Sequence, residues 1–401
     1  MVQRLRECII AKKRAVWAAA AIIAGFCVFY LFFRSAGPFR GRAGQPFIVR
    51  IRVVHNAEKI RLSADAPCRV RDAATGGLLG DGIEMKASAG ISPYEGGIKL
   101  DDTEFPAGRL RVSVPGGEAL TLDGTAYRGE MDIIRTRGGL DAVNRVELED
   151  YLKGVLPCEV NHLWPFAALK AQAIVSRTFA VSQVLLRRRR DYDMTDDTFF
   201  QVYGGKTSEK WRTTLAVEKT KNKVLEYNGR IFPAYFHSCC GGHTEDASRL
   251  WNEGIPPLKG VRCAWCRWSP YFRWQARVPA RVMIRKFKDA GYDIRRVDDI
   301  RPGARDISGR LEYLRIRSGN KWFEIKGSDF SRLIGSRVIR STNLRIKKYP
   351  FFYYFSGYGW GHGVGMCQWG AFGLALRWWS AERIVKHYYP GSRIVDLREV
   401  I

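Results

Sequence analysis

A single glutamate, Glu159, stands in surroundings that suit proton transfer to a glycosidic oxygen. It falls in an irregular break between two helical segments and is flanked by Val160, Leu163 and Trp164. Apolar surroundings disfavour a charged carboxylate, so they raise its pKa and keep a proton on it near neutral pH. A general acid in glycoside cleavage must hold such a proton and deliver it to the departing oxygen. Glu159 is therefore a candidate proton donor.

Cysteines and histidines in the middle of the chain have metal-ligand spacing. Two cysteines separated by two residues, as in Cys263-Ala264-Trp265-Cys266, are typical of a tetrahedral zinc site. The spacing predicts one Zn²⁺ held by Cys240, His243, Cys263 and Cys266, with Cys239 and His237 as substitutes. In an oxidising compartment the four cysteines can form two disulfides instead. Spacing alone leaves zinc, disulfides and free thiols open.

The glycine-rich block YGWGHGVGMCQWGA at 358–371 suits a loop that lines a carbohydrate groove. Aromatic faces stack on sugars, and small residues let the backbone approach a ligand. The block predicts a binding loop with Trp360, His362 and Gln368, whereas a tight structural turn is the plainer alternative. A nucleophile pair of Cys367 and His362 is a weaker interpretation, because no third catalytic group is identifiable.

Two basic residues, Lys170 and Arg177, lie seven residues apart in a predicted helix and so share one face. We expect them to orient Glu159 or to grip sugar and lactyl groups. Cations close to Glu159 would lower its pKa and oppose its role as an acid. The alternative is an ordinary surface face with snorkelling side chains.

The elements that must position these residues indicate an α+β fold. Between about 46 and 144, short β-branched stretches alternate with turn signals, which predicts a β-rich module. A mixed catalytic body follows at 145–394. It begins with a helical segment that Pro157 interrupts, and Trp164-Pro165 opens a long helix that runs to about Arg188. A single final helix is expected to contain ALRWWSAERIVKHYY at 375–389.

Several unusual motifs occur in an order that resembles the stage II sporulation protein D (SpoIID) family of lytic transglycosylases, from about residue 46 to 394. The matching blocks are LEDYL at 148–152, Glu159, Trp164-Pro165, ALKAQA at 168–173, Arg177-Thr178, QVYGG at 201–205, FHSCCGGHTED at 236–246, GWGHGVGMCQWGA at 359–371 and HYYPG at 387–391. Family members commonly have serine where this chain has Cys367. They often have Met-Pro where it has Val160-Asn161.

The resemblance implies a catalytic role for Glu159 as acid and base. In glycan strands that an amidase has already stripped of stem peptides, the bond between N-acetylmuramic acid and N-acetylglucosamine would break, and the muramic C6 hydroxyl would close a 1,6-anhydro ring. One carboxyl group serves both steps because the nucleophile is tethered to the substrate. From the matching blocks we expect Gln201, Tyr203 and Tyr235 to bind substrate or support the site. The relatives named LytB imply an alternative: a non-catalytic enhancer that stimulates a cell-wall amidase.

The N-terminus predicts a membrane anchor. Residues 15–33 form an apolar run of 19 residues between basic flanks. At about 1.5 Å per residue, such a helix approaches the ~30 Å hydrocarbon thickness, and the run is longer than the apolar core of a cleaved signal peptide. The denser basic cluster precedes the run, which predicts a cytoplasmic tail at 1–14 and places the bulk of the chain in the periplasm or extracytoplasmic space.

The formal net charge of +26 favours an anionic or polyhydroxylated partner. Peptidoglycan glycan strands, phospholipid headgroups and nucleic acid all fit that description electrostatically. Export excludes most nucleic-acid roles, so we expect wall glycan, a cell-wall amidase and the membrane as partners, and no nucleic acid.

Overall fold

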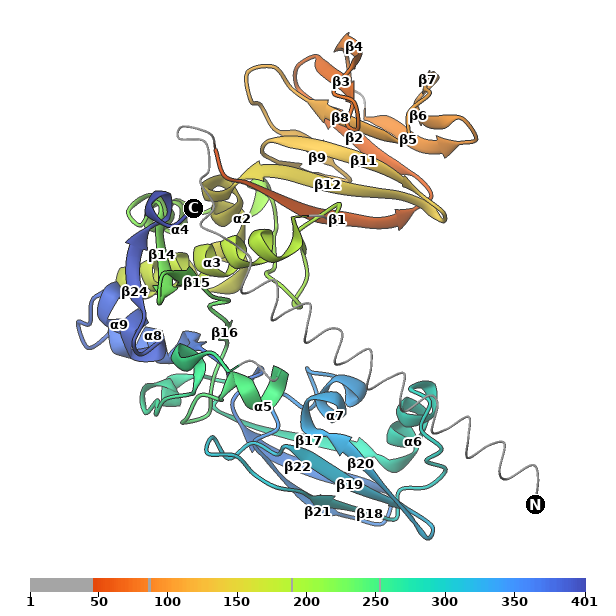
Figure 1. Ribbon diagram of the computed structural model, residues 1–401. Helices are drawn as coiled ribbons and strands as arrows, with labels where there is room; N and C mark the ends of the chain where they lie inside the picture. The colour runs from red at the N-terminus through yellow and green to blue at the C-terminus, as the bar shows by residue number, and fades with distance from the viewer. Residues whose placement is uncertain (1–45, 86–87, 189, 252–253) are drawn as a thin grey trace. The chain divides into compact units, whose positions relative to one another are not determined.

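The computed structural model describes residues 46–85, 88–188, 190–251 and 254–401 (Figure 1). Its mixture of helices and sheets confirms the expected α+β class. Residues Pro46–Asp396 form one compact unit, which the following paragraphs describe. The predicted tail at 1–14 and anchor at 15–33 lie outside the described residues. Within the described ranges, no helix is long and apolar enough to cross a membrane.

Strands fill the region expected to be β-rich. They are β1 (Ile48–Ala57), β2 (Ile60–Ala64), β3 (Cys68–Asp72), β4 (Leu78–Ile83), β5 (Ala89–Tyr94), β6 (Gly97–Leu100), β7 (Thr103–Phe105), β8 (Arg109–Ser113), β9 (Leu120–Leu122), β10 (Thr125–Tyr127), β11 (Glu130–Thr136), β12 (Gly139–Glu147) and, further along, β13 (Met194–Thr195). They form two sheets with the orders β13-β1-β12-β11-β8-β3-β4 and β10-β9-β2-β5-β6-β7. In β1, Val49 and Ile51 are buried and alternate with Arg50 and Arg52, so one face of the strand packs inside.

The helices follow β12 and dominate the centre of the chain. They are α2 (Leu148–Glu159), α3 (Phe166–Arg187), α4 (Trp211–Glu218), α5 (Ala247–Trp251), α6 (Ala280–Asp289), α7 (Gly327–Ile334), α8 (Gln368–Ala375) and α9 (Ala381–Tyr388), with short 3-10 turns η1 (Lys206–Ser208), η2 (Pro256–Leu258) and η3 (Trp265–Trp268). Helix α3 contacts α2, α4, α8 and α9. Its alanines allow these close approaches, and most of its length is buried.

Two expectations about helices are wrong in detail. Pro157 does not interrupt the first helix, because α2 continues through it to Glu159; the lost N–H falls in the last turn, where it removes one hydrogen bond. The expected single final helix is two helices. Trp378 adopts the left-handed conformation (φ 62°) between them, and the Ser380 side chain accepts a hydrogen bond from the Arg383 N–H (3.2 Å) to begin α9.

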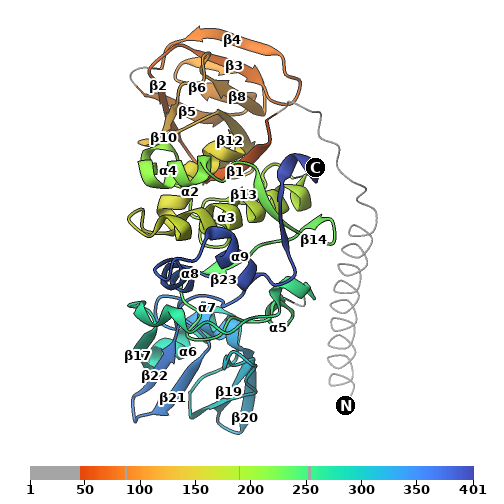
Figure 2. The same ribbon diagram turned by 90° about the vertical axis from the view of Figure 1, so that its left-hand side faces the viewer.

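The remaining strands form four small sheets. Strands β14 (Lys223–Tyr227), β15 (Arg230–Ile231) and β24 (Arg393–Asp396) make one, and β16 (Phe236–His237) pairs in parallel with β23 (Met366–Cys367). Between them in sequence lie the sheet β17 (Arg273–Pro279), β22 (Phe352–Tyr358), β21 (Leu344–Lys348) and the sheet β18 (Asp299–Pro302), β19 (Tyr313–Ser318), β20 (Lys321–Lys326). Helices α6 and α7 cover one side of these last two sheets (Figures 1 and 2). Their shared core contains Met283, Phe330 and Phe355.

Candidate active site and cysteine cluster

Glu159 is the last residue of α2, and its carboxyl group is held by two hydrogen bonds. The Val202 backbone N–H donates to Oε1 (2.9 Å), and the Gln368 side-chain amide donates to Oε2 (3.5 Å). Burial raises the pKa of Glu159 from 4.5 to about 7, because loss of water disfavours the carboxylate more than the two hydrogen bonds stabilise it. The group therefore holds a proton on about half of the molecules at neutral pH.

Two predicted site residues, Gln201 and Tyr203, anchor the loop that supplies the Val202 N–H. The Gln201 side chain accepts a hydrogen bond from the Tyr151 hydroxyl (3.1 Å) and lies fully buried. Tyr203 is also buried, and its hydroxyl donates to Asn144 (2.9 Å). Both side chains point into the protein, so they support the loop and are not free to contact a sugar.

Gln368 reaches Glu159 because α8 begins at this residue. The parallel bridge between β16 and β23 fixes the chain before the helix, and the Cys367 sulfur accepts a hydrogen bond from the Gly370 N–H (3.3 Å) at the helix start. The site therefore joins the end of α2 to the beginning of α8. Those elements are 209 residues apart in sequence.

The predicted aromatic residues form two separate contacts. Tyr235, Trp251 and His362 pack together, with ring centroids 4.4 Å apart for Tyr235 and Trp251 and 5.2 Å apart for Trp251 and His362. Trp360 instead lies against Tyr271, at 4.5 Å. These rings provide apolar surfaces of the kind that stack on sugars.

His362 is neutral, and it does not activate Cys367. One ring nitrogen donates to the Phe236 carbonyl (2.9 Å) and the other accepts from the Val364 N–H (3.1 Å). Burial lowers the pKa of His362 to about 4. Both ring nitrogens are occupied by backbone groups, so the structure does not make a cysteine-peptidase pair of the two residues.

Among the described residues, neither of the two basic residues expected to orient Glu159 forms a hydrogen bond with its carboxyl group. Arg177 is fully buried and forms a two-pronged ion pair with Glu149 (2.7 and 2.9 Å), and it also donates to the Val217 carbonyl (3.2 Å). It is a structural residue that ties α3 to α2 and α4. Lys170 lies over the Phe166 ring, at 5.4 Å. Neither cation contributes to the pKa of Glu159, so the expected conflict with its acid role does not arise.

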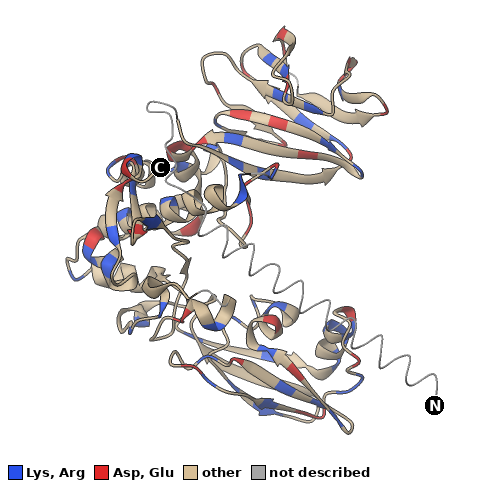
Figure 3. Cartoon of the chain, viewed as in Figure 1, with Lys and Arg blue, Asp and Glu red and all other residues tan. Residues whose placement is uncertain are grey.

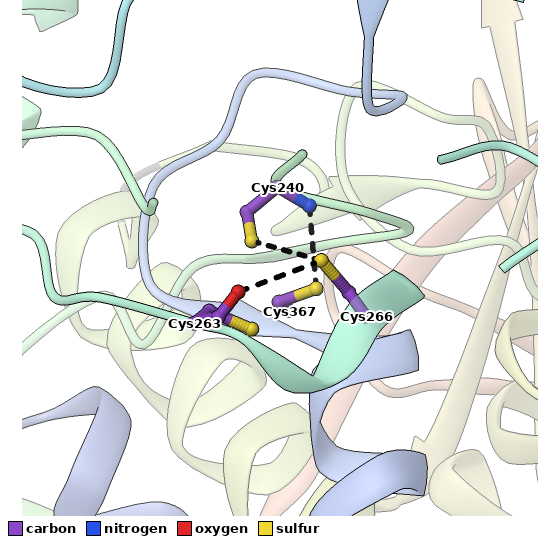
Figure 4. Close-up of side chains that lie close together, drawn as sticks. All are labelled: Cys240, Cys263, Cys266 and Cys367. Carbon is purple, nitrogen blue, oxygen red and sulfur yellow. Dashed lines mark hydrogen bonds between the residues drawn. The ribbon is translucent and has the colours of Figure 1, made fainter. Parts of the chain in front are cut away.

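Four buried cysteines converge in a cluster that can hold a metal ion (Figure 4). The sulfurs of Cys240, Cys263, Cys266 and Cys367 all lie within 4.8 Å of one another, and those of Cys240 and Cys266 are 3.5 Å apart. A tetrahedral zinc site with ~2.3 Å bonds places its sulfurs ~3.8 Å apart. The described cysteines form no disulfide. The donor set therefore fits one tetrahedral ion.

The structure corrects the expected ligand set in its fourth member. Cys367 occupies the place expected for His243, whose Nδ1 is instead hydrogen-bonded to the Thr244 carbonyl (2.7 Å). Neither substitute belongs to the group of four, although the Cys239 thiol borders it and hydrogen-bonds with Cys266. His237 donates from Nδ1 to the Val364 carbonyl (3.1 Å), and Cys239 contacts the Cys266 carbonyl (3.9 Å).

Backbone N–H groups aim at the cluster sulfurs, as they do around thiolate ligands. Cys240 N–H donates to the Cys367 sulfur (3.2 Å), and Gly242 N–H donates to the Cys240 sulfur (3.4 Å). Neighbouring thiols donate to Cys266 and lower its pKa. Such partners orient the ligands and stabilise their negative charge.

A buried polar network that the sequence did not reveal lies behind the cluster. Arg310 is buried and donates to the Cys240 carbonyl (3.0 Å) and to the Ser308 hydroxyl (3.1 Å). Ser308 donates in turn to Glu245 (2.9 Å). Burial and the nearby Asp306 raise the pKa of Glu245 to about 8. Only the order of charged residues was visible in sequence, and it does not show that these side chains meet.

Comparisons with known proteins agree with the motif order. The family model described as stage II sporulation protein matches residues 136–227, and a domain of unknown function matches 266–365. The stage II sporulation protein D of Bacillus amyloliquefaciens is 32% identical over 273 residues, which cover 64% of this chain and 76% of that protein. An uncharacterized protein of Brachyspira hyodysenteriae is 33% identical over 71% of this chain and 76% of its own.

A further relative carries a different name. The amidase enhancer of Bacillus subtilis is 30% identical over 351 residues, which cover 75% of this chain. The match spans 49% of that protein, so the chain corresponds to about half of its length.

Proposed function

The chain belongs to the stage II sporulation protein D family, and we propose that it is a peptidoglycan lytic transglycosylase with Glu159 as its acid and base. The observation that carries the proposal is the buried setting of the Glu159 carboxyl group, held by Val202 and Gln368 at the end of α2. Burial raises its pKa to about 7, and among the described residues no second carboxylate acts on that pKa. Hydrolytic glycosidases use two carboxyl groups, whereas an intramolecular attack needs one.

The proposed reaction moves one proton twice. Glu159 donates its proton to the oxygen that leaves with N-acetylglucosamine, and the muramic C1 develops oxocarbenium character. The resulting carboxylate then accepts the proton of the muramic C6 hydroxyl, whose oxygen bonds to C1. No water is consumed, and Glu159 returns to its protonated state. The Val202 N–H and the Gln368 amide hold the carboxyl group in place through both steps.

The test compares the purified full chain with Glu159→Gln on amidase-treated peptidoglycan, with mass spectrometry of the products. We expect anhydro-muramic ends from the wild type and a loss of about 100-fold or more in the variant, the usual scale for removing a general acid. Glu218→Gln is the matched control, because it makes the same change at an exposed residue of α4. Equal product from Glu159→Gln and the wild type would remove Glu159 from the mechanism.

The name of the Bacillus subtilis relative favours a second candidate, an amidase enhancer. Such a protein binds the wall and stimulates an N-acetylmuramoyl-L-alanine amidase without cutting glycan itself. It predicts no anhydro products, together with faster release of stem peptides when the chain is added to an amidase. That stimulation would persist in Glu159→Gln.

We propose one structural Zn²⁺ in the cluster of Cys240, Cys263, Cys266 and Cys367. Four thiolates leave no open coordination position, so the ion would brace the fold and not bind substrate. The convergence of the sulfurs and the N–H groups directed at them support this assignment. Metal analysis of the purified chain checks it, and a chain that holds no ion when purified without chelators would refute it.

We propose that the chain is anchored by residues 15–33 with its bulk outside the cytoplasmic membrane. The proposal rests on the apolar run and on the basic residues that precede it. Protease added to intact spheroplasts should digest an epitope at the C-terminus. Protection of that epitope until the membrane is lysed would place the chain inside the cell. It would also exclude a cell-wall substrate.

A further inference from the structure

The sheet β17-β22-β21 presents a face on which aromatic rings alternate with cations. Its other face is buried, with Trp274, Val278 and Phe355 in the core beneath α6 and α7. Because directly paired residues of antiparallel strands share a face, the strand register identifies the side chains on the open side.

The register arranges these side chains in cross-strand rows. Tyr354 lies between Arg277 and Lys347, and Tyr358 is paired with Arg273. The guanidinium of Arg277 lies over the Phe352 ring at 3.9 Å.

A polar cross-strand row lies between the row of Tyr354 and the pair formed by Tyr358 and Arg273. Ser356 stands between Gln275 and Arg345, so the face offers hydrogen-bonding groups as well as rings and charges. In the described residues, no carboxylate forms an ion pair with Arg273, Arg277, Arg345 or Lys347.

A groove of about 700 Å³ opens on this face. Its lining includes the guanidinium-bearing residues Arg273, Arg305 and Arg345 together with Gln275 and Asn343, and no acidic residue. Burial and the neighbouring Arg345 lower the pKa of Arg305. Cations therefore outnumber carboxylates here, and Asp306 is the acidic group that acts on Arg305.

One of these guanidinium groups is held in position. Arg305 donates to the carbonyls of Gly309 and Leu344, both at 2.6 Å. A second groove of about 630 Å³ shares Arg273 and Tyr358 with the first and continues to Phe272. The cationic surface is therefore longer than one small anion requires.

The surrounding region is strongly basic. Residues 273–358 contain 21 Lys and Arg against 8 Asp and Glu, which gives a net charge of +13, half of the total of +26. Lys and Arg recur along its strands and helices (Figure 3). This segment lies within the part matched by a domain of unknown function.

The spacing of the cations fits a polymer. Arg273 and Arg277 are four residues apart on one strand, which separates their backbones by about 13 Å. Strand β22 separates β17 from β21, so Arg277 and Lys347 are roughly 10 Å apart across the sheet. Charges at such intervals, with rings between them, match a chain of sugars that bears anions at regular intervals.

We propose that this face binds a glycan strand whose muramic units carry free lactyl carboxylates. When an amidase removes a stem peptide, the amide at the lactyl group becomes a carboxylate, so a stripped strand bears one negative charge per disaccharide. Arginine pairs with carboxylates through two parallel hydrogen bonds, and the tyrosine rings stack on the sugars between them.

The inference rests on the proposed glycan substrate and assigns binding of stripped strands to side chains other than Glu159 and its hydrogen-bond partners. β22 ends at Tyr358, and ten residues later Gln368 donates to Glu159. The glycine-rich loop between them thus connects the binding face to the proposed acid.

The experiment measures binding of the full chain carrying Glu159→Gln, which cannot cut, to amidase-treated peptidoglycan. A triple variant, Arg273→Gln, Arg277→Gln and Arg345→Gln, removes three charges from the face. The matched control, Arg281→Gln, Arg285→Gln and Lys288→Gln, removes three exposed charges from α6 on the other side of the sheet. We expect the face variant to bind about tenfold more weakly or worse, and the control to change by less than about twofold.

Several outcomes would overturn the proposal. If the face variant and the α6 control lose the same affinity, the effect comes from net charge alone. If the face variant loses no affinity, the face does not bind the strand. Intact peptidoglycan, whose lactyl groups are amidated, should show little difference between the variants. If the face variant loses affinity for duplex DNA or for vesicles with anionic lipids but not for stripped strands, the surface serves another partner. Should the triple variant unfold, Arg273→Gln and Arg345→Gln must each weaken binding alone.

The two proposals fail in different ways. Anhydro products from the wild type with unchanged binding by the face variant would retain the enzyme and refute the surface. Weakened binding by the face variant without anhydro products would retain the surface on a non-catalytic wall protein.

Discussion

The raised pKa of Glu159 links catalysis to stability. An unfolded glutamate titrates near 4.5, whereas folding raises the pKa of Glu159 to about 7. Between these values the folded state binds more protons than the unfolded state, so the contribution of this group to stability falls as pH rises through about 7. The proposed catalytic acid is therefore expected to destabilise the chain under alkaline conditions.

Glu159→Gln should be more stable than the wild type at pH 8. The carboxylate must then be deprotonated in partly buried surroundings, while the amide has no charge to lose. The shift corresponds to at most ~3 kcal/mol, and partial exposure reduces this to about 1–2 kcal/mol. At pH 4 both side chains are neutral in both states, and thermal unfolding should show little difference. A variant with equal or lower stability at pH 8 would contradict the raised pKa.

The same titration sets the pH dependence of cleavage. A general acid must be protonated when the substrate binds, so kcat/KM of the wild type should fall with an apparent pKa near 7 on the alkaline side. Gln368→Ala removes the longer of the two hydrogen bonds to the carboxylate. Because that bond lowers the pKa of Glu159, its loss should shift the apparent pKa of the alkaline limb to a slightly higher pH. A limb at the same pH in both proteins would show that Gln368 does not act on the carboxyl group.

Individual side chains were predictable where their chemistry is local. Apolar neighbours made Glu159 a candidate, the family resemblance singled it out, and burial is the physical cause of its raised pKa. Arg177 was not predictable in the same way, because spacing places a residue on a helix face but does not name its partner. That partner is Glu149, which lies 28 residues earlier and closes a buried ion pair.

Elements with strong periodic signals were predicted well. The alanine-rich helix α3 begins and ends within two residues of the expected positions, because helix propensity and the opening proline act locally. The breaks were harder to predict. Pro157 has the strongest helix-breaking signal of its region, yet it lies where α2 is ending anyway, and the real break before α9 depends on one left-handed residue, Trp378.

The fourth cysteine of the cluster shows how pairing between distant elements limits inference from spacing. Cys367 lies 101 residues after Cys266, and the parallel pairing of β16 with β23 brings it beside Cys240. No local pattern reports that pairing. The cysteine in place of the family's usual serine is the available signal, and by itself it does not indicate a metal site.

At the scale of the whole molecule, the cluster joins segments that are far apart in the chain. Its cysteines come from the residues after β16, from positions just before and within η3, and from the residue before α8. Arg310 extends the connection to the basic region at 273–358 through the Cys240 carbonyl. A bound ion would therefore stabilise the start of α8, where Gln368 contacts Glu159.

Removing one ligand should release the metal and loosen these segments together. Cys367→Ser replaces a thiolate by a hydroxyl, so zinc affinity should fall by more than the ~100-fold that loss of an outer-shell partner costs. Because binding energy of a structural ion contributes to folding, EDTA should lower the midpoint of thermal unfolding in the wild type and have little effect on the variant.

Cys158→Ser is the matched control, since Cys158 is exposed and outside the cluster. Metal analysis and the visible spectrum of the Co²⁺-substituted chain measure coordination independently of activity. Retention of one ion by Cys367→Ser after the same chelator treatment would exclude Cys367 as a ligand and return the fourth position to another side chain.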